Sequence, residues 1–280
     1  MKIYEWNIGM ASTIPSNQGY NLKGWIIDEI IKDEPDCIVL TEFVVSRGIE
    51  YFFDMLEKNN YHWFISSTTK TNGILIALKE TSFDFKETFE YKLPMPTVCG
   101  KEILSGINLP DFLEVCVNWQ NEPLSIIGIR INVDIIESDS KTNKKAFKIS
   151  QFKALDSFLS KKHNVLCIGD FNAYWGNTWE TTNNMLLDTK DAGYTLHTPN
   201  YDKDGFSYVQ PDGVKTQLDH LITNITGRKI TPRYDWSFIN TLRYKPGIKK
   251  ESPNKPSGLP DHAILKVEIS DTKDNSLDNK

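Results

Sequence analysis

A short polar segment directly after a buried apolar run most constrains how this 280-residue chain can fold. The apolar run 165–168 leads into Gly169-Asp170-Phe171-Asn172-Ala173. A short apolar run is typical of a buried strand, and the end of a strand is a rigid place for a functional side chain. Asp170 and Asn172 lie two residues apart, which places them on one face, whereas Phe171 points to the other. A carboxylate beside an amide suits the orientation of an attacking water or the binding of a hard metal ion.

A second segment near the far end of the chain has the same character. Leu259-Pro260-Asp261-His262 precedes the apolar residues Ala263-Ile264-Leu265. Here a carboxylate adjoins an imidazole, the commonest acid–base group near neutral pH. Each segment taken alone is more typical of a turn than of a catalytic site, so the interpretation depends on the rest of the chain.

Three further strand-like runs carry a polar residue. The run 3–6 ends in Asn7, the nearly continuous apolar run 36–41 ends in Glu42, and Asp219 lies within the run 217–222. Polar residues spread from position 7 to position 262 can meet only if the two ends of the chain pack together. This spacing favours one domain over two, although 280 residues would permit either.

Five strand-associated sites carrying Asn, Glu, Asp/Asn, Asp and Asp-His, in this order, resemble the endonuclease/exonuclease/phosphatase superfamily of the deoxyribonuclease I and exonuclease III type. The matching segments are WN at 6–7, PDCIVLTE at 35–42, GDFNA at 169–173, QLDHLIT at 217–223 and LPDHAIL at 259–265. The resemblance implies an α/β fold, a four-layer sandwich of two packed mixed β-sheets flanked by helices, with the site at one edge. We expect residues 1–269 to form this single catalytic domain and residues 270–280 to be a disordered tail.

The resemblance also implies roles for individual residues. Carboxylate and amide oxygens suit Mg²⁺ or Mn²⁺, and the implied metal ligands are Asn7, Glu42, Asp170, Asn172 and Asp261. The implied catalytic residues are Asp170, Asn172, Asp219 and His262, and Arg130 is a further catalytic candidate that the residues themselves suggest. Asp170 would deprotonate the water, and Asp219 would accept the second ring proton of His262 and fix its tautomer.

Arg130 departs from the family pattern. In many members the strand that corresponds to 126–131 carries a catalytic histidine near this position, whereas here an arginine interrupts an apolar run. One interpretation is an outward-facing, solvated arginine. The other is a guanidinium that faces phosphate, since an isolated charge on such a strand needs a partner and a planar fork can hold two phosphate oxygens.

Composition limits the choice of function without deciding it. The net charge of −5 excludes a globally basic surface of the kind many nucleic-acid binders show. The run between Arg243 and Lys255 is locally basic, however, and leads into Asp261-His262. With no leader peptide before residue 3, no membrane-length apolar stretch and four widely spaced cysteines, we expect a cytoplasmic protein that binds no membrane.

These observations predict a divalent-metal-dependent phosphodiesterase, a nuclease acting on DNA or RNA. Two alternatives stay open. One is a phosphatase or phosphodiesterase for inositol phosphates or another small phosphate ester on the same fold. The other is a binding or regulatory protein in which Arg130 has weakened catalysis. Protein partners are not predicted.

Periodicity also predicts the main elements. Apolar spacing indicates helices over 21–32, 48–59 and 146–161. Strands are expected at 63–66 and 73–78, and a hairpin over 113–120 and 124–132 around the turn 121–123. A strand, a helix and a second strand at the start of the chain indicate a βαβ unit with parallel strands.

Overall fold

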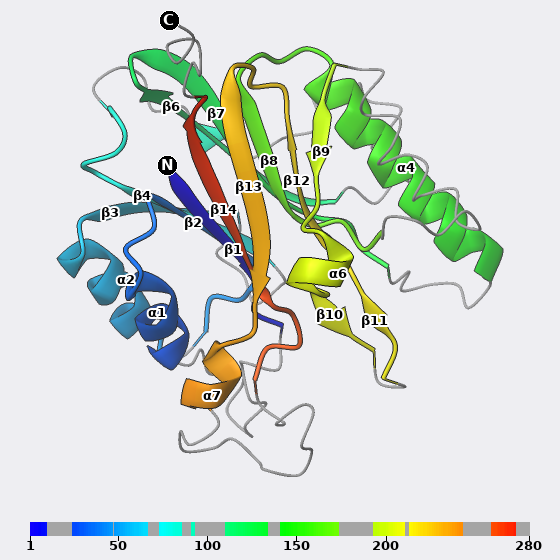
Figure 1. The fold of residues 1–280 in the computed structure, drawn as a ribbon, viewed down its shortest axis with the longest axis horizontal. Coiled ribbons are helices and arrows are strands. Elements are labelled where there is room, and N and C mark those ends of the chain that lie inside the picture. Colours follow the sequence, from blue (N-terminus) through cyan, green and yellow to red (C-terminus); the bar gives the residue numbers. More distant parts are fainter. Residues whose placement is uncertain are drawn as a thin grey trace, which may run out of the picture.

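Two six-stranded β-sheets pack face to face in the computed structural model (Figure 1). The structure describes residues 1–9, 24–46, 48–66, 73–85, 91–92, 110–133, 141–173, 193–210, 213–242 and 259–272. The basic run 243–255, placed by the sequence beside the site, lies outside these residues, as does most of the expected tail.

The first sheet has the strand order β13-β14-β1-β2-β4-β3. Its strands are β1 (Lys2–Asn7), β2 (Cys37–Phe43), β3 (Tyr61–Ile65), β4 (Gly73–Lys79), β13 (Arg228–Asp235) and β14 (Ile264–Asp271). β1 pairs with β2 in parallel, as the predicted βαβ unit requires, and with β14 antiparallel. The first and last strands of the described chain are therefore neighbours in the middle of one sheet.

The second sheet has the order β5-β6-β7-β8-β12-β9. It contains β5 (Tyr91–Lys92), β6 (Asp111–Trp119), β7 (Glu122–Arg130), β8 (Val165–Asp170), β9 (Thr195–His197) and β12 (Asp219–Thr223). A separate hairpin of β10 (Tyr208–Val209) and β11 (Lys215–Thr216) stands beside it. Both sheets are mixed, as the resemblance implied.

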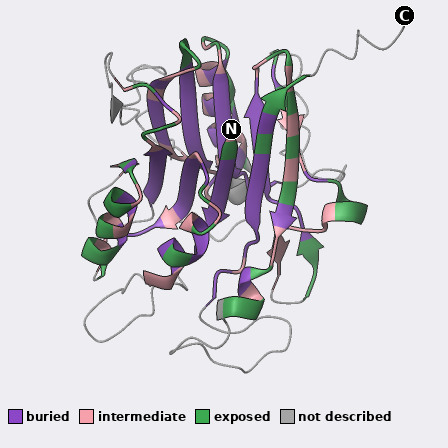
Figure 2. Cartoon of the chain, turned by 60° about the vertical axis from the view of Figure 1, so that its left-hand side comes forward, coloured by how far each residue is buried: buried purple, intermediate pink, exposed green. Residues whose placement is uncertain are grey.

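Helices cover the outer faces of the sandwich. α1 (Gly24–Ile31) and α2 (Ile49–Lys58) lie on the first sheet, and α4 (Lys141–Leu159) lies on the second (Figure 1). Two short helices, α6 (Tyr201–Asp204) and α7 (Phe238–Leu242), complete the described elements. The apolar residues form three clusters, one between the sheets and one under each helical layer, so that buried positions fill the middle of the molecule (Figure 2). The predicted four-layer sandwich is confirmed.

Element boundaries differ from expectation, most clearly in three places. The hairpin turn lies at Gln120 and Asn121, both with positive φ, and Pro123 is inside β7 opposite Asn118. A two-residue turn with positive φ at both positions matches the twist of paired strands, and proline is tolerated near a strand end. Helix α4 starts at residue 141 rather than 146. β14 runs to Asp271, two residues past position 269, where the predicted domain ends.

Gly169 in the GDFNA segment is required by the close approach of β8 to β7. Its φ is +155°, and a Cβ atom there would lie 1.9 Å from the carbonyl oxygen of Ile129. Gly169 is also paired with Ile129 in the parallel register. The glycine therefore lets β8 deliver Asp170 to the edge of the sheet.

Gly169→Ala is expected to destabilise the fold by at least about 3 kcal/mol, the upper end of the range for overpacking, because the clash is with backbone. The matched control is Gly193→Ala, where φ is +82° and nothing lies within 4 Å of the added Cβ. That variant carries only the cost of a left-handed alanine, about 1–2 kcal/mol. Urea unfolding of both variants gives the comparison, and an equal loss of stability would show that the close approach does not matter.

Candidate active site

Polar side chains gather at one edge of the sandwich. Asn7 ends β1, Arg130 ends β7 and Asp170 ends β8, while Glu42 is the next-to-last residue of β2. Asp219 begins β12, which runs antiparallel to β8 and so starts at the same edge. His262 lies just before β14. The structure thus brings these predicted residues to one place from distant parts of the chain.

Within the second sheet the charged residues form a row across four strands. Asp111 of β6 is opposite Arg130, Arg130 is opposite Asp170, and Asp170 is opposite Asp219. Asp111 was not predicted from the sequence. The row carries three carboxylates against one guanidinium, so it favours the binding of a further cation.

Asp170 is the centre of the site. Its side chain accepts hydrogen bonds from the Nδ2 atoms of Asn7 (2.9 Å) and Asn172 (3.0 Å) and from the backbone N–H of Asn172 (2.8 Å). Burial is the main cause that raises the pKa of Asp170, and the negative charge of Asp219 raises it further. The positive charges of His262 and Arg130 lower it, and the pKa of Asp170 is about 6. The carboxylate is therefore ionised at neutral pH yet more basic than an ordinary aspartate, which suits a general base.

His262 and Asp219 form a buried pair. Nδ1 of His262 donates to Oδ2 of Asp219 at 2.8 Å, and Trp6 Nε1 donates to the His262 carbonyl oxygen. Burial disfavours the charged imidazole, but the charge and hydrogen bond of Asp219, with Asp170 and Asp261, raise the pKa of His262 to about 10. The ring is therefore an imidazolium at neutral pH and can donate a proton or a hydrogen bond through Nε2.

Glu42 and Arg130 form the other side of the site. The Nε and Nη2 atoms of Arg130 lie 2.9 and 2.8 Å from Oε1 of Glu42, and only 12% of the arginine side chain is exposed. Arg130 is therefore not the outward, solvated residue of the first interpretation. Its Nη1 atom contacts Asp111 and Asn132.

Two site residues have strained backbones. Glu42 has φ +53° and lies where the β2–β4 register shifts, and Asn172 has φ +48°. Left-handed conformations of non-glycine residues cost about 1–3 kcal/mol and concentrate at functional sites. At Asn172 this backbone turns the side chain back, so that its Nδ2 reaches both Asp170 and the carbonyl oxygen of Ile131.

Asn7 and Asp261 were predicted as metal ligands. The Nδ2 atom of Asn7 donates to Asp170 and, at 3.4 Å, to Glu42, while its Oδ1 atom accepts from the backbone N–H of Gly9. In this arrangement Asn7 holds the two carboxylates together, and its amide would have to turn to present oxygen to a cation. Asp261 is partly buried and adds to the negative charge around His262.

A third buried carboxyl, beside those of Asp170 and Asp219, was not among the residues that the resemblance implied. Glu5 is fully buried, accepts a hydrogen bond from Thr41 through Oε1, and has no hydrogen-bond partner for Oε2 among the described residues. Burial, with the charges of Asp219 and Asp170, raises the pKa of Glu5 well above its ordinary value. The period of two along β1 puts Glu5 on the face of Asn7, and this signal could have identified it from the sequence.

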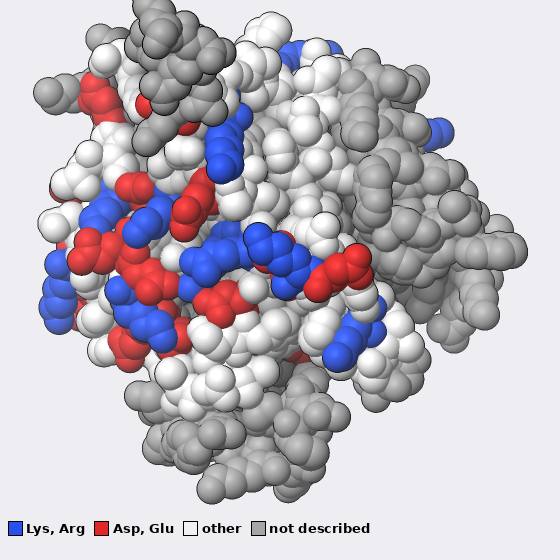
Figure 3. All heavy atoms as spheres, in the orientation of Figure 1, with Lys and Arg blue, Asp and Glu red and all other residues white. Residues whose placement is uncertain are grey.

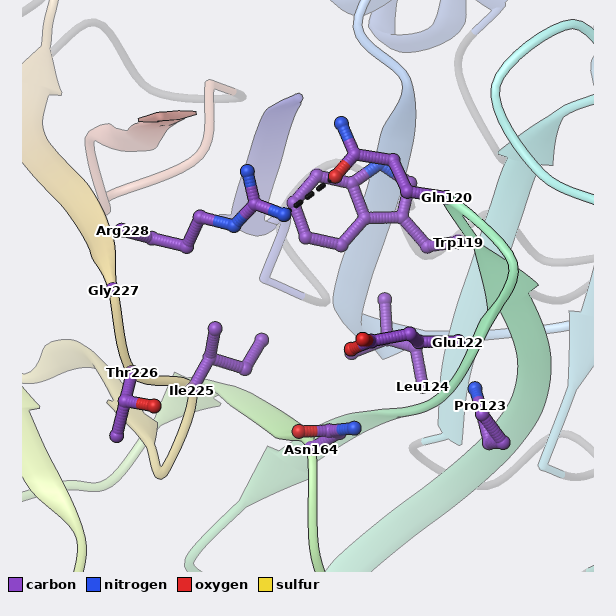
Figure 4. Close-up of a pocket in the computed structure, with 10 residues that line it drawn as sticks. All are labelled: Trp119, Gln120, Glu122, Pro123, Leu124, Asn164, Ile225, Thr226, Gly227 and Arg228. Carbon is purple, nitrogen blue, oxygen red and sulfur yellow. Dashed lines mark hydrogen bonds between the residues drawn. The ribbon is translucent and has the colours of Figure 1, made fainter. Parts of the chain in front are cut away.

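Three other observations delimit the site. His220 lies next to Asp219 but faces the other way, where its Nε2 donates to the Ala173 carbonyl and its Nδ1 accepts from Thr198. At the opposite end of the sheet, a pocket of about 370 Å³ lies beside Trp119 and Arg228 and contains none of the predicted site residues (Figure 4).

The described part of the surface seen in Figure 3 carries both basic and acidic side chains, which are intermixed and form no patch of a single charge.

Comparison with known proteins identifies the family of the chain and supports its fold. The sequence model of the Endonuclease/Exonuclease/phosphatase family matches residues 5–224. No curated protein sequence matches the chain significantly.

No described helix has the length and apolar character needed to cross a membrane.

Solved structures share the fold at low sequence identity. An AP endonuclease from Archaeoglobus fulgidus has a TM-score of 0.63 at 12% identity, over 96% of this chain and 99% of that one. A variant of the 3′ phosphatase NExo from Neisseria, bound to a product DNA hairpin, has a TM-score of 0.60 at 14% identity, with 96% and 99% coverage. D. rerio TDP2 complexed with a single-strand DNA product has a TM-score of 0.56 at 13% identity, with 96% and 98% coverage. With the family match over most of the chain, these findings show that the chain belongs to the Endonuclease/Exonuclease/phosphatase family.

Proposed function

We propose that this protein is a divalent-metal-dependent phosphodiesterase that hydrolyses nucleic acid. The observation that carries the proposal is the arrangement around Asp170. A buried carboxylate with a pKa of about 6 lies between the imidazolium of the His262–Asp219 pair and the Glu42–Arg130 pair. A base, an acid and a cation-binding carboxylate at one edge are the groups that hydrolysis of a phosphodiester needs.

The donor set fits a hard divalent cation. Glu42, Asp170 and the two asparagines offer carboxylate and amide oxygens, and none of the described residues gathered at the site is a thiol. The described residues contain no cluster of three or more His, Cys, Asp or Glu that could hold a metal. Mg²⁺ is commonly bound through one or two carboxylates and otherwise by water and phosphate, so a single strong ligand, Glu42, is sufficient. Asn7, Asp170, Asn172 and Asp261 complete the proposed ligand set.

The side chains then divide the chemistry between them. Asp170, held by Asn7 and Asn172, takes the proton of a water that attacks phosphorus. His262, oriented by Asp219, donates a hydrogen bond to the phosphate and supplies the proton that the leaving oxygen takes up when its bond to phosphorus breaks. Arg130 stabilises charge on the phosphate through its planar fork. A bound Mg²⁺ or Mn²⁺ would neutralise charge on the phosphate and the leaving oxygen.

Nucleic acid is the proposed substrate class because of the structures that share the fold. NExo is described with a DNA hairpin and TDP2 with single-strand DNA, and both align over almost the whole chain. The basic run between Arg243 and Lys255 leads into Asp261, and this run would contact a polyanion near the site.

An activity panel tests the proposal. Purified protein with Mg²⁺ or Mn²⁺ is incubated with plasmid, single-stranded DNA, RNA and inositol phosphates, each with an EDTA control. We expect cleavage of at least one nucleic acid that EDTA abolishes. Hydrolysis of inositol phosphates without nuclease activity would support the small-ester alternative, and activity that persists in EDTA would contradict the metal requirement.

A further inference from the structure

Arg130 lies between two carboxylates that come from different sheets. On one side two of its nitrogens contact a single oxygen of Glu42, at 2.8 and 2.9 Å. On the other side Nη1 lies 3.3 Å from Oδ2 of Asp111 and also contacts Asn132. The side chains of Arg130, Glu42 and Asp111 are 12, 17 and 22% exposed, so bulk water screens them only in part.

The pairing with Glu42 has a cost for cation binding. A guanidinium on Oε1 of Glu42 neutralises the charge that a divalent cation needs, and it occupies one of the two carboxylate oxygens. Arg130 is therefore a competitor for Glu42 that is part of the chain itself. Asp111 opposes this competition, because it attracts the same guanidinium through a different nitrogen, Nη1.

The register explains why Asp111 can do this. Asp111 is the first residue of β6 and lies directly opposite Arg130, the last residue of β7. Asp111 contacts Nη1, whereas Glu42 contacts Nε and Nη2, so the guanidinium can keep its contact with Asp111 after it has left Glu42. Asn132 provides a further acceptor on that side.

We propose that Asp111 is a positioning residue for metal binding: it offers the Arg130 guanidinium a second carboxylate, so that Glu42 can exchange the guanidinium for a divalent cation. This inference rests on the proposed function, because it assumes that Glu42 is a metal ligand. It assigns Asp111 a role that acts through Arg130 and not through contact with metal or substrate.

A double-mutant cycle on the full chain separates this role from a simple charge effect. Mn²⁺ affinity is measured by isothermal titration calorimetry for wild type, Asp111→Asn, Arg130→Met and the double variant. We expect Asp111→Asn to weaken Mn²⁺ binding by about tenfold, which corresponds to a coupling within the range for contacting residues. Arg130→Met should tighten binding, and in that background Asp111→Asn should change affinity by less than about twofold.

Each result decides between explanations. Equal weakening by Asp111→Asn in both backgrounds would overturn the proposal, since Asp111 would then act through its own charge. Failure of wild type to bind Mn²⁺ would overturn the proposed metal site and this inference together, whereas equal weakening in both backgrounds overturns the inference alone, so the two failures are distinguishable. Asp156→Asn on the exposed side of α4 shows how much a remote charge contributes. Should Arg130→Met not fold, Arg130→Gln keeps a hydrogen-bonding amide and carries the same expectations.

Discussion

Asp170→Asn is expected to lower kcat by about 10²–10⁴-fold, the range for loss of a general base. The asparagine keeps the size of the side chain but cannot take a proton from water at neutral pH. Substrate affinity should stay similar or become tighter, because a negative charge near the phosphate is removed. Single-turnover kinetics and a binding assay with the same oligonucleotide measure the two effects separately.

The network around Asp170 sets the control for this experiment. Two amide groups and one backbone N–H donate to the carboxylate, so the substitution also disturbs hydrogen bonds that the fold uses. Asp156→Asn, an exposed aspartate of α4, controls for the amino-acid change itself. Unfolding curves for both variants show whether the fold is intact. An Asp170→Asn protein that turns over at the wild-type rate would place the base elsewhere.

Glu42→Gln is expected to abolish metal-dependent activity while the fold survives. The amide keeps an oxygen that can accept from Arg130, so the local packing remains, but it lacks the charge that a hard cation needs. Loss of a metal ion removes several kcal/mol of transition-state stabilisation, or about 10³-fold or more in rate. The decisive measurement is the rate as a function of Mg²⁺ concentration, together with Mn²⁺ affinity.

A surface glutamate provides the comparison. Glu57→Gln changes an exposed residue of α2 and should leave both the rate and the metal affinity unchanged. Near-wild-type rates for Glu42→Gln at limiting Mg²⁺ would show that Glu42 is not a ligand.

The sequence predicted those parts of the fold that depend on local pattern. The apolar runs that end in Asn7, Glu42 and Asp170 are strands in the structure, and the βαβ unit at the start has its parallel pairing. These predictions succeed because a buried strand needs a continuous apolar run whatever its neighbours are. The edge strand β13 alternates exposed and half-buried residues over most of its length, includes Pro232, and was not predicted.

The contacts of the site residues could not be read from the chain. The surroundings of Arg130 depend on the register of β6 against β7 and on the packing of one sheet against the other, which brings Glu42 to Arg130. No local pattern encodes either. For the same reason Asp111, a single acidic residue after a proline, was not recognised as part of the site.

The position of β14 between β1 and β13 has a consequence for biosynthesis. The chain is made from its N-terminus, and domains generally fold as units during synthesis. Until the residues around position 262 emerge, β1 lacks one of its two neighbours and Asp219 lacks its imidazole partner. A nascent or prematurely terminated chain that stops before this point can hold the GDFNA segment but has no assembled site. Any activity that depends on the His262–Asp219 pair would therefore require a chain that includes this last part of the domain.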